Sequence, residues 1–566
     1  MKDVAIKSSG LKMFLVLFVL LTACRFGQPL GQDEISHYYK CIRMLYLDGY
    51  SHPADVITFS PHLYPLLACG VCKLTGHFNQ AAVQMTGVFC WLAVICLLWK
   101  LAKTTQEQWV ACGLCILLPM VQQAAVTIEI DQTVLPLVTL LLCWRAKCFM
   151  DDGTKKNGLW LAASMALALW ARLTTPIVLI PLFVGFAWWS TDWRRAAKTA
   201  VWLLIGCAVF FVTWRLYCMA TGVNWFGPFD YLARSFRETT VGERASGASR
   251  LVQNMLYLVF WGMNPFLIVL TVGSVLVGYV RKLPRTELCY LAAGVWLLCG
   301  YEIVGGALFG FPKYQIPAMP LICLGIALAW RGLWSFKPIG RLGMAHLVIL
   351  GLLSCVLLMK TGDPLHAMRI DVRETAVVGG AVRLEMMKLG LLFAVCWGAL
   401  SMAVVLFWWR VPVMTLWQLL LLGVLWTNGV FSVWQGNRPY ATGYVYGDEG
   451  ETKMLAKRIV DNGWTDCPLL APHEVLFQTG DFRLVDGLPM DWTDLDAVAE
   501  RIGNEHPPMV AVSVLTNTTS EVRNVLRHEK LQKILRDDYI MERFGRYYIW
   551  YKPSESNGKV TLPHDR

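Results

Sequence analysis

The sequence predicts an α-helical protein that crosses a membrane many times and ends in a small α/β domain. Of its 566 residues, 56% are hydrophobic and only 16% are charged, with a mean hydropathy of +0.46. This composition is too apolar for one soluble domain of this length. Apolar runs of about 17 to 25 residues, the length of a membrane-spanning helix, recur along residues 1–439. From Tyr440 the composition changes to that of a soluble domain.

The apolar runs predict about thirteen spans. They begin near Leu11, Ala82, Gln108, Gln132, Gly158, Thr174, Ala200, Leu251, Glu287, Gln315, Ala345, Leu389 and Val413. The first run is interpreted as a retained span, because no clean small-residue cleavage site follows it. The shorter run 60–73 contains Pro61, His62 and Pro65, and we interpret it as a juxtamembrane or re-entrant hairpin.

Basic loops orient these spans. If the run 60–73 does not cross, the basic loops all fall on the N-terminal, cytoplasmic side, as the positive-inside rule requires. These loops contain Lys100/Lys103, Lys147/Lys155/Lys156, Arg194/Arg195/Lys198, Arg281/Lys282/Arg285, Arg331/Lys337/Arg341 and Arg410. The regions 28–80, 222–250 and the chain after Trp434 then lie outside the cytoplasm, with a smaller loop at 361–388. We expect an integral protein of a bacterial inner (plasma) membrane.

The C-terminal region, 440–566, has the pattern of a mixed domain. Helical patterns cover 451–460, 494–502 and 521–535, and strand patterns cover 468–471, 483–485, 509–514 and 546–551. Most of the 18 cysteines lie in apolar runs instead. The pairs Cys69/Cys72 and Cys112/Cys115 have the spacing of a zinc half-site or redox pair, but their apolar neighbours favour helix packing.

Carboxylates gather at span ends on the predicted extracytoplasmic face. Asp33 and Glu34 follow the first span and open a predicted interfacial helix, whose apolar stripe is Tyr38, Tyr39, Met44, Leu45 and Leu47. Glu129 and Asp131 stand just before the span that begins at Gln132. Charges near hydrocarbon are costly and mark functional sites, although an acidic pair at a helix start also serves as a cap.

Cations on the same predicted face are candidates for a phosphate clamp: Arg172, Lys313 beside Tyr314, and Arg234, Arg237, Arg244 and Arg250 in one loop. The alternative is that these side chains extend to lipid headgroups. His37, His52, Asp55 and His62 offer a divalent-metal site with Asp33 or Glu34, but no metal-ligand spacing supports it. We expect no cofactor and no nucleic-acid partner.

Five weak motifs follow one another in order. They are Asp33-Glu34 with Tyr38, Pro61-His62-Leu63-Tyr64 before Leu74-Thr75-Gly76, Glu129-Ile130-Asp131, Ala171-Arg172-Leu173-Thr174-Thr175-Pro176, and Pro312-Lys313-Tyr314-Gln315-Ile316-Pro317-Ala318-Met319-Pro320. In this order the chain resembles the GT-C class of polyprenyl-phosphate-sugar-dependent glycosyltransferases, which includes protein O-mannosyltransferases and the lipid A aminoarabinose transferase. Phe59-Ser60 stands where the aminoarabinose enzyme has a Glu-Lys pair, which argues against that particular activity.

The resemblance implies a role for each candidate. Asp33 would be the catalytic base, with Glu34 beside it, and Asp131 would help to hold acceptor or donor. Lys313, Tyr314, Arg172, Arg234 and Arg237 would face the donor phosphate. The resemblance also implies a C-terminal extracytoplasmic domain and an acceptor that is a lipid, a glycan or a protein hydroxyl.

The residue types fit such a transfer independently. In one inverting displacement, a carboxylate takes the acceptor proton while cations stabilise the departing polyprenyl phosphate. A transporter or flippase of a lipid-linked or anionic substrate is the alternative, but it would favour inverted repeats and ionisable groups near mid-membrane. A receptor or scaffold explains the C-terminal domain but leaves the acidic sites without a role.

Overall fold

The computed structural model describes most of the first 331 residues and much of the C-terminal region. The described residues are 2–23, 25–26, 33–47, 60–240, 265–280, 284–303, 312–331, 421, 425, 449–467, 469–479, 495–513, 524–544 and 547–552. The spans predicted near Ala345, Leu389 and Val413 and the strand predicted at 483–485 lie outside them. The chain forms two compact units, one of Met1–Gln28 and His37–Gly443 and one of Pro29–Ser36 and Tyr444–Arg566.

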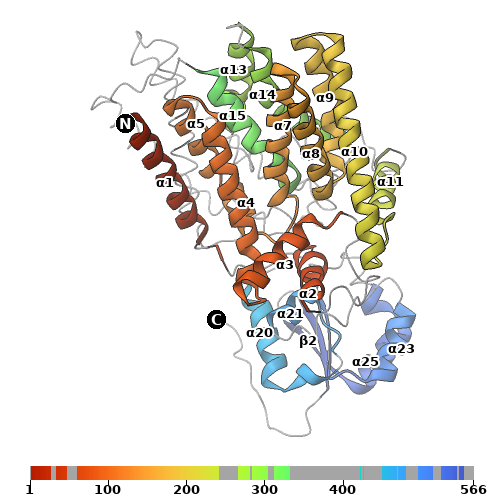
Figure 1. Cartoon of the computed structure of the whole chain (residues 1–566). Coiled ribbons are helices and arrows are strands. Elements are labelled where there is room, and N and C mark those ends of the chain that lie inside the picture. The colour runs from red at the N-terminus through yellow and green to blue at the C-terminus, as the bar shows by residue number, and fades with distance from the viewer. Residues whose placement is uncertain are drawn as a thin grey trace. The chain divides into compact units, whose positions relative to one another are not determined.

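Helices make up the described part of the first unit, and many of them run side by side (Figure 1). In chain order they are α1 (Lys2–Ala23), η1 (Asp33–Tyr39), α2 (Lys40–Leu47), α3 (Leu63–Thr75), α4 (Gln80–Leu101), α5 (Thr105–Ile116), α6 (Pro119–Val126), α7 (Val134–Asp152), α8 (Lys155–Ala171), α9 (Thr174–Ser190), α10 (Trp193–Thr221), α11 (Gly227–Thr240), α13 (Pro265–Val280), α14 (Arg285–Ile303), η4 (Pro312–Ala318) and α15 (Met319–Ala329). The first residues of η1, 33–36, belong to the second unit.

Among the described helices, α4 and α10 are each long and apolar enough to cross a membrane. A third span results if α5 and α6 are counted as one helix, bent by 69° at a break. The continuous span predicted from Gln108 is therefore interrupted, and Pro119 at the start of α6 accounts for the break, since proline has no N–H to continue a helix. The late span predicted from Gln315 likewise begins as the 3₁₀ turn η4, which contains Pro317.

Helix caps explain where other elements begin. Helix α10 starts at Trp193, earlier than the predicted Ala200, because the Asp192 side chain caps it by accepting a hydrogen bond from Arg195 N at 2.6 Å. At the predicted span near Leu251 the structure has α13, which starts at Pro265, and residues 251–264 lie outside the described part. Helix α1 also starts earlier than predicted, at Lys2 instead of near Leu11, whereas α4, α7, α8, α9 and α14 begin within three residues of their predicted positions.

Helix α3 covers most of the run that was predicted not to cross. Its 13 residues rise about 20 Å, which is less than the roughly 30 Å of a bilayer core. It ends at Gly76, whose left-handed φ of 72° closes the helix. Helix α3 packs against α2 and α4 at one end of the bundle (Figure 1). In α2 and η1, Tyr38, Tyr39 and Met44 of the predicted interfacial stripe are buried, whereas Leu47 is 55% exposed.

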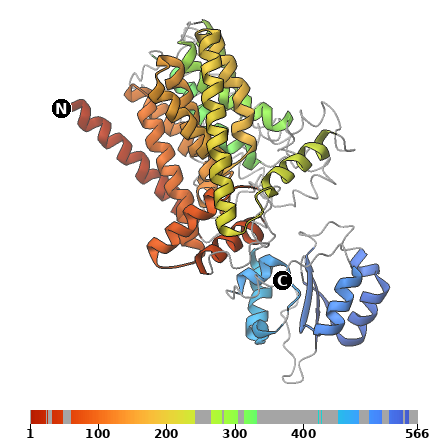
Figure 2. The same ribbon diagram turned by 45° about the vertical axis from the view of Figure 1, so that its right-hand side comes forward.

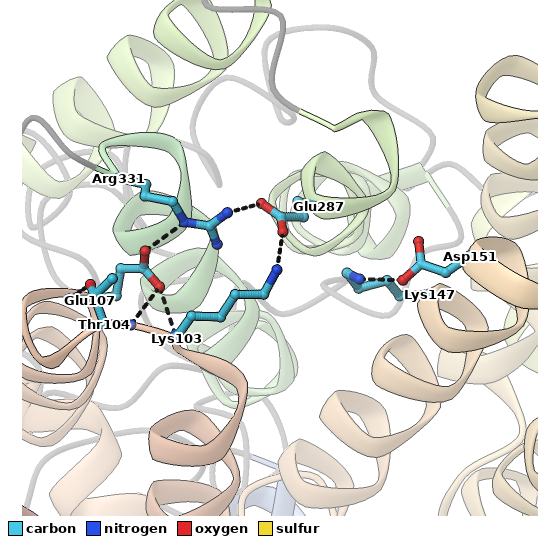
Figure 3. A network of polar contacts seen from close by, with 7 residues as sticks. All are labelled: Lys103, Thr104, Glu107, Lys147, Asp151, Glu287 and Arg331. Carbon is cyan, nitrogen blue, oxygen red and sulfur yellow. Dashed lines mark hydrogen bonds and ion pairs between the residues drawn. The ribbon is translucent and has the colours of Figure 1, made fainter. Parts of the chain in front are cut away.

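Charged residues join helices at the end of the bundle where α4 ends (Figure 3). Arg331, just after α15, lies between two buried carboxylates: its Nε is 2.6 Å from Glu107 Oε1 and its Nη1 is 2.9 Å from Glu287 Oε2. Lys103 Nζ approaches Glu287 Oε1 at 2.9 Å. Glu107 also closes a capping box with Thr104 at the start of α5. The neighbouring ends of α4, α5, α14 and α15 are thereby tied together.

Other basic loops meet at this same end. Arg195 donates to the Phe149 carbonyl at 3.1 Å, and Arg285 donates to the Trp189 carbonyl at 2.5 Å. Lys147 pairs with Asp151, one turn further along α7 (Figure 3). The described basic loops that the positive-inside rule assigned to one side therefore gather at one end of the bundle.

The second unit is built around a three-stranded antiparallel sheet of order β1-β3-β2, from Met509–Ser513 (β1), Ile540–Phe544 (β2) and Tyr547–Tyr551 (β3). Helices α20 (Glu449–Asp461) and α21 (His473–Gln478) lie on one side of it, and α23 (Leu495–Glu505) and α25 (Glu529–Asp538) lie on the other (Figure 2). Strand β2 and helix α21 were not predicted. The helix predicted over 521–535 is interrupted at His528, whose side chain caps α25.

Candidate functional site

A buried ion pair lies at the opposite end of the bundle from the network of Figure 3. Arg172 Nε is 3.4 Å from Asp131 Oδ1, and the two side chains are only 9% and 2% exposed. Asp131 precedes α7 and Arg172 follows α8, the two ends that lie furthest from Lys147 and Asp151. Two sequence motifs thus meet in one contact.

Backbone contacts hold Asp131 in the turn between α6 and α7. The Trp91 indole donates to the Gln132 carbonyl at 2.9 Å, and Thr133 donates to the Glu129 carbonyl at 2.5 Å. The Glu129 side chain accepts from Gln132 Nε2 at 2.7 Å. Glu129 is therefore used to build the turn, and Asp131 is the carboxylate directed at Arg172.

Arg172 is placed by the end of α8. Its N–H donates to the Ala168 carbonyl at 3.0 Å, but its backbone is extended, with φ −155° and ψ 137°. Pro176 follows in the first turn of α9, where a proline is tolerated because that N–H has no helical partner. The chain therefore turns at Arg172, and the side chain enters the protein instead of continuing along the helix.

Phenol groups from three further segments lie near this cation. Arg172 interacts electrostatically with Tyr38 of η1, Tyr314 of η4 and Tyr231 of α11, besides Asp131. The ring of Tyr38 also meets that of Tyr64 edge-on, with centroids 5.7 Å apart. Residues of four of the five sequence motifs, and one residue of the loop 222–250, thus lie near Arg172, and Tyr64 of the remaining motif meets Tyr38.

The predicted base and its neighbour lie next to this cluster in sequence. Asp33 and Glu34 form the first residues of η1, the helix that carries Tyr38. Glu34 is half-buried, and the side chain of Asp33 lies outside the described residues. The role of Asp33 as catalytic base stays a prediction.

The remaining predicted phosphate ligands are described by their backbone alone. Lys313 lies in η4 immediately before Tyr314, and Arg234 and Arg237 lie in α11, within two turns of Tyr231. In Figure 2 α11, in yellow-green, extends away from the bundle. Their side chains lie outside the described part, as do Arg244 and Arg250.

Several residues of this region were not predicted as site residues. Tyr38, Tyr64 and Tyr231 were passed over because an aromatic residue at a span end is ordinary in a membrane protein. His62, offered as a metal ligand, instead has its Nδ1 3.0 Å from the Tyr217 hydroxyl, and Tyr217 lies near the end of α10. Arg25 is fully buried, 3.2 Å from Gln122 Oε1. The signal for Arg25 was a lone cation directly after the first apolar run.

The described residues contain no group of three or more His, Cys, Asp or Glu side chains able to hold a metal ion. His52 and Asp55 lie outside this part of the chain. The Cys69/Cys72 and Cys112/Cys115 pairs are buried free thiols on α3 and α5. Cys112 packs against the α4 backbone, with its Sγ 3.8 Å from the Ile95 carbonyl oxygen.

The arrangement has the chemistry of an anion site. A guanidinium carries five N–H donors in a planar fork, more than one carboxylate accepts, so Arg172 can pair with Asp131 and also meet a phosphate oxygen. Asp131 compensates the buried cation while no anion is bound. The surrounding phenols are further hydrogen-bond donors.

A family model matches the part of the chain that contains Asp131 and Arg172. Residues 60–217, which include His62, Asp131 and Arg172, match the family model of dolichyl-phosphate-mannose-protein mannosyltransferase. A search of curated protein sequences found no match.

Solved structures agree in fold. Crystal structures of ArnT from Cupriavidus metallidurans are similar, one bound to undecaprenyl phosphate and one in the apo state. The bound structure has a TM-score of 0.55 at 15% identity, covering 98% of this chain and 99% of that chain. The apo structure has a TM-score of 0.55 at 14% identity, covering 96% and 98%. The chain therefore has a polytopic helical membrane fold, and the predicted resemblance to the GT-C class is confirmed.

Proposed function

We propose that this protein is a membrane glycosyltransferase of the GT-C type, which transfers a sugar from a polyprenyl-phosphate donor to an extracytoplasmic lipid, glycan or protein hydroxyl. The observation that carries the proposal is the buried ion pair of Asp131 with Arg172, which has Tyr38 and Tyr314 nearby. These residues come from separate motifs of the sequence resemblance, and the family match covers two of them, Asp131 and Arg172.

The reaction needs one base and one anion site. A carboxylate, Asp33 in this proposal, removes the proton of the acceptor hydroxyl as its oxygen forms a bond to the anomeric carbon. The bond from that carbon to the donor phosphate oxygen breaks, and the phosphate leaves with the electron pair. Arg172 and Lys313 stabilise the negative charge that develops on the leaving phosphate.

In this proposal Arg172 pairs with Asp131 before the donor binds and with both Asp131 and the donor phosphate afterwards. Without donor its charge is balanced by Asp131. A bound phosphate brings further negative charge to the same guanidinium, which is buried and therefore poorly screened by water. Asp131 then holds the fork in orientation while its remaining donors face the phosphate.

The test is transfer of radiolabelled sugar from a panel of polyprenyl-phosphate donors by the purified full-length protein, with its own membrane extract supplying acceptors. We expect labelled product from the wild type and a loss of about 10²- to 10⁴-fold in Asp33→Asn, the usual contribution of general-base catalysis. Asp151→Asn is the matched control, because its carboxylate lies at the other end of the bundle. It is expected to transfer normally.

Two results would count against this proposal in different ways. Normal turnover by a folded Asp33→Asn protein would remove Asp33 as the base but keep the enzyme. If the folded wild type transfers sugar from none of the donors, the glycosyltransferase assignment fails. Movement of a lipid-linked substrate across vesicle membranes would then be the activity to measure.

A further inference from the structure

Two cations share one indole ring at the end of the bundle that carries the basic loops. Lys100 Nζ, in the last turn of α4, lies 4.8 Å from the centre of the Trp144 ring. Arg145 Cζ lies 3.9 Å from the same ring and 5.0 Å from that of Trp160 on α8. Helix α7, which carries Trp144 and Arg145, packs against both α4 and α8. The cluster thus joins three neighbouring helices.

Among the described residues, no carboxylate neutralises either cation. Other cations at this end form ion pairs, Lys103 with Glu287 and Lys147 with Asp151. Within the part of the chain that the structure describes, Lys100 and Arg145 form no ion pair, and the buried Nε of Arg145 has no acceptor. Aromatic faces attract each cation but carry no net charge, so two like charges remain close together. A bound anion would relieve this repulsion.

An exposed apolar surface leads up to these cations. Phe89 of α4 is 50% exposed and stands eleven residues before Lys100, which is about three turns or 16 Å along the same helix face. On α8, Leu159 is 54% and Trp160 is 49% exposed. Cations at the helix ends next to an exposed apolar face match the layout of a phospholipid, whose charged headgroup lies above its acyl chains.

We propose that Lys100, Arg145, Trp144 and Trp160 form a binding site for the phosphodiester headgroup of an anionic phospholipid, at the end of the bundle away from the Asp131–Arg172 pair. The Arg145 fork pairs with two phosphate oxygens, and Lys100 adds a point charge. The indoles hold both cations at the membrane–water boundary, where tryptophan is enriched. The acyl chains lie on the outer faces of α4 and α8. The site is independent of the proposed transfer reaction.

Lipid preference tests this site directly. The full-length protein, purified in a neutral detergent, is titrated with phosphatidylglycerol or with phosphatidylcholine of the same acyl chains, and retained lipid is counted by native mass spectrometry. We expect phosphatidylglycerol to bind and to raise the unfolding temperature, with phosphatidylcholine much weaker. In Lys100→Gln/Arg145→Gln, the affinity for phosphatidylglycerol should fall about tenfold or more, since charge-assisted hydrogen bonds are lost.

The matched control is Lys155→Gln/Lys156→Gln, which removes two exposed cations from the start of α8 at the same end. This variant should still prefer phosphatidylglycerol to phosphatidylcholine, because neither lysine is part of the cluster around Trp144 and Trp160. If both double variants lost the same affinity for phosphatidylglycerol, net charge alone would explain the effect, and the proposed site would be overturned. If inorganic phosphate alone raised the unfolding temperature as phosphatidylglycerol does, the assignment to a lipid would be overturned.

If the Lys100→Gln/Arg145→Gln protein does not fold, the single variant Arg145→Lys tests the site instead. It keeps the charge but loses the fork, and it should weaken phosphatidylglycerol binding while leaving the unfolding temperature in lipid-free detergent unchanged. Wild-type affinity in Arg145→Lys would contradict the proposed recognition of phosphate by the guanidinium.

Discussion

The guanidinium of Arg172 and the carboxylate of Asp131 face each other with Nε and Oδ1 3.4 Å apart, in a part of the protein almost without solvent exposure. A buried pair of this kind is held by mutual compensation, because each charge has lost its water. Removing one partner leaves the other charge buried and uncompensated, at a cost of about 3 to 5 kcal/mol. The pair therefore contributes to folding as well as to the proposed anion site.

A double-mutant cycle separates these contributions. Asp131→Asn and Arg172→Gln should each lower the unfolding temperature strongly, whereas the double variant should lose less than the sum of the two, because no unpaired charge remains. Thermal unfolding in detergent measures the cycle. Strictly additive losses would show that the two residues are not coupled.

Sugar transfer should respond differently in the same cycle. If Arg172 binds the donor phosphate, the double variant recovers stability but not transfer, and its KM for donor stays high. If the double variant recovered both sugar transfer and stability, the pair would have a structural role alone. Other cations would then have to bind the donor phosphate.

Lys313 is the cation to test next, because it precedes Tyr314, whose phenol interacts with Arg172. Lys313→Gln should raise the KM for the polyprenyl-phosphate donor, since an attraction to its phosphate is removed. Lys313→Arg keeps the charge and should retain most of the affinity. Steady-state transfer kinetics at varied donor concentration measure both variants. An unchanged KM in Lys313→Gln would exclude this lysine from the clamp.

At the other end of the bundle, Arg331 compensates two buried carboxylates at once, those of Glu107 and Glu287. Among the described residues, Arg331→Gln leaves the ion pair of Lys103 with Glu287 and no ion pair to Glu107, and we expect a loss of stability on the order of 3 kcal/mol or more. Lys147→Gln is the control. It breaks an i,i+4 surface pair with Asp151, which is worth about 0.3 to 0.5 kcal/mol. Equal unfolding temperatures for the two variants would contradict this difference.

The sequence predicted where several helices of the membrane region begin and which end carries the basic loops, because apolar length and basic loops are properties of composition. The positions of α4, α8, α9 and α14 and the gathering of Lys103, Lys147 and Arg331 at one end follow from them. The break between α5 and α6 and the 3₁₀ start of the late span were missed, although Pro119 and Pro317 were visible. A proline inside an apolar run allows either a kink or a break, and neighbouring helices decide which.

The candidate site was predicted in its members but not in its pairing. Asp131 and Arg172 were expected to meet a ligand, and their contact with each other depends on α7 and α8 returning to the same end. Tyr38 and Tyr231 lie near Arg172 although they belong to chain segments distant from it in sequence. Such non-local contacts have no signal in a single sequence. In the second unit, the hydrogen-bonded pairing of β2 with β3 likewise depends on packing.

Close helix packing beside the site gives the last prediction. A Cβ added to Gly87 of α4 would clash with the Ala125 carbonyl oxygen of α6 and approach Thr133 Cγ2 to 2.7 Å. Thr133 ends the turn that holds Asp131, so Gly87→Ala should displace this turn, cost about 1 to 3 kcal/mol and lower sugar transfer. Gly185→Ala on α9 is the control, because an added Cβ meets no described atom within 4 Å. It should be neutral or slightly stabilising, since alanine favours helix. Unfolding temperature and transfer rate measure both variants, and equal behaviour would show that the α4–α6 contact does not position Asp131.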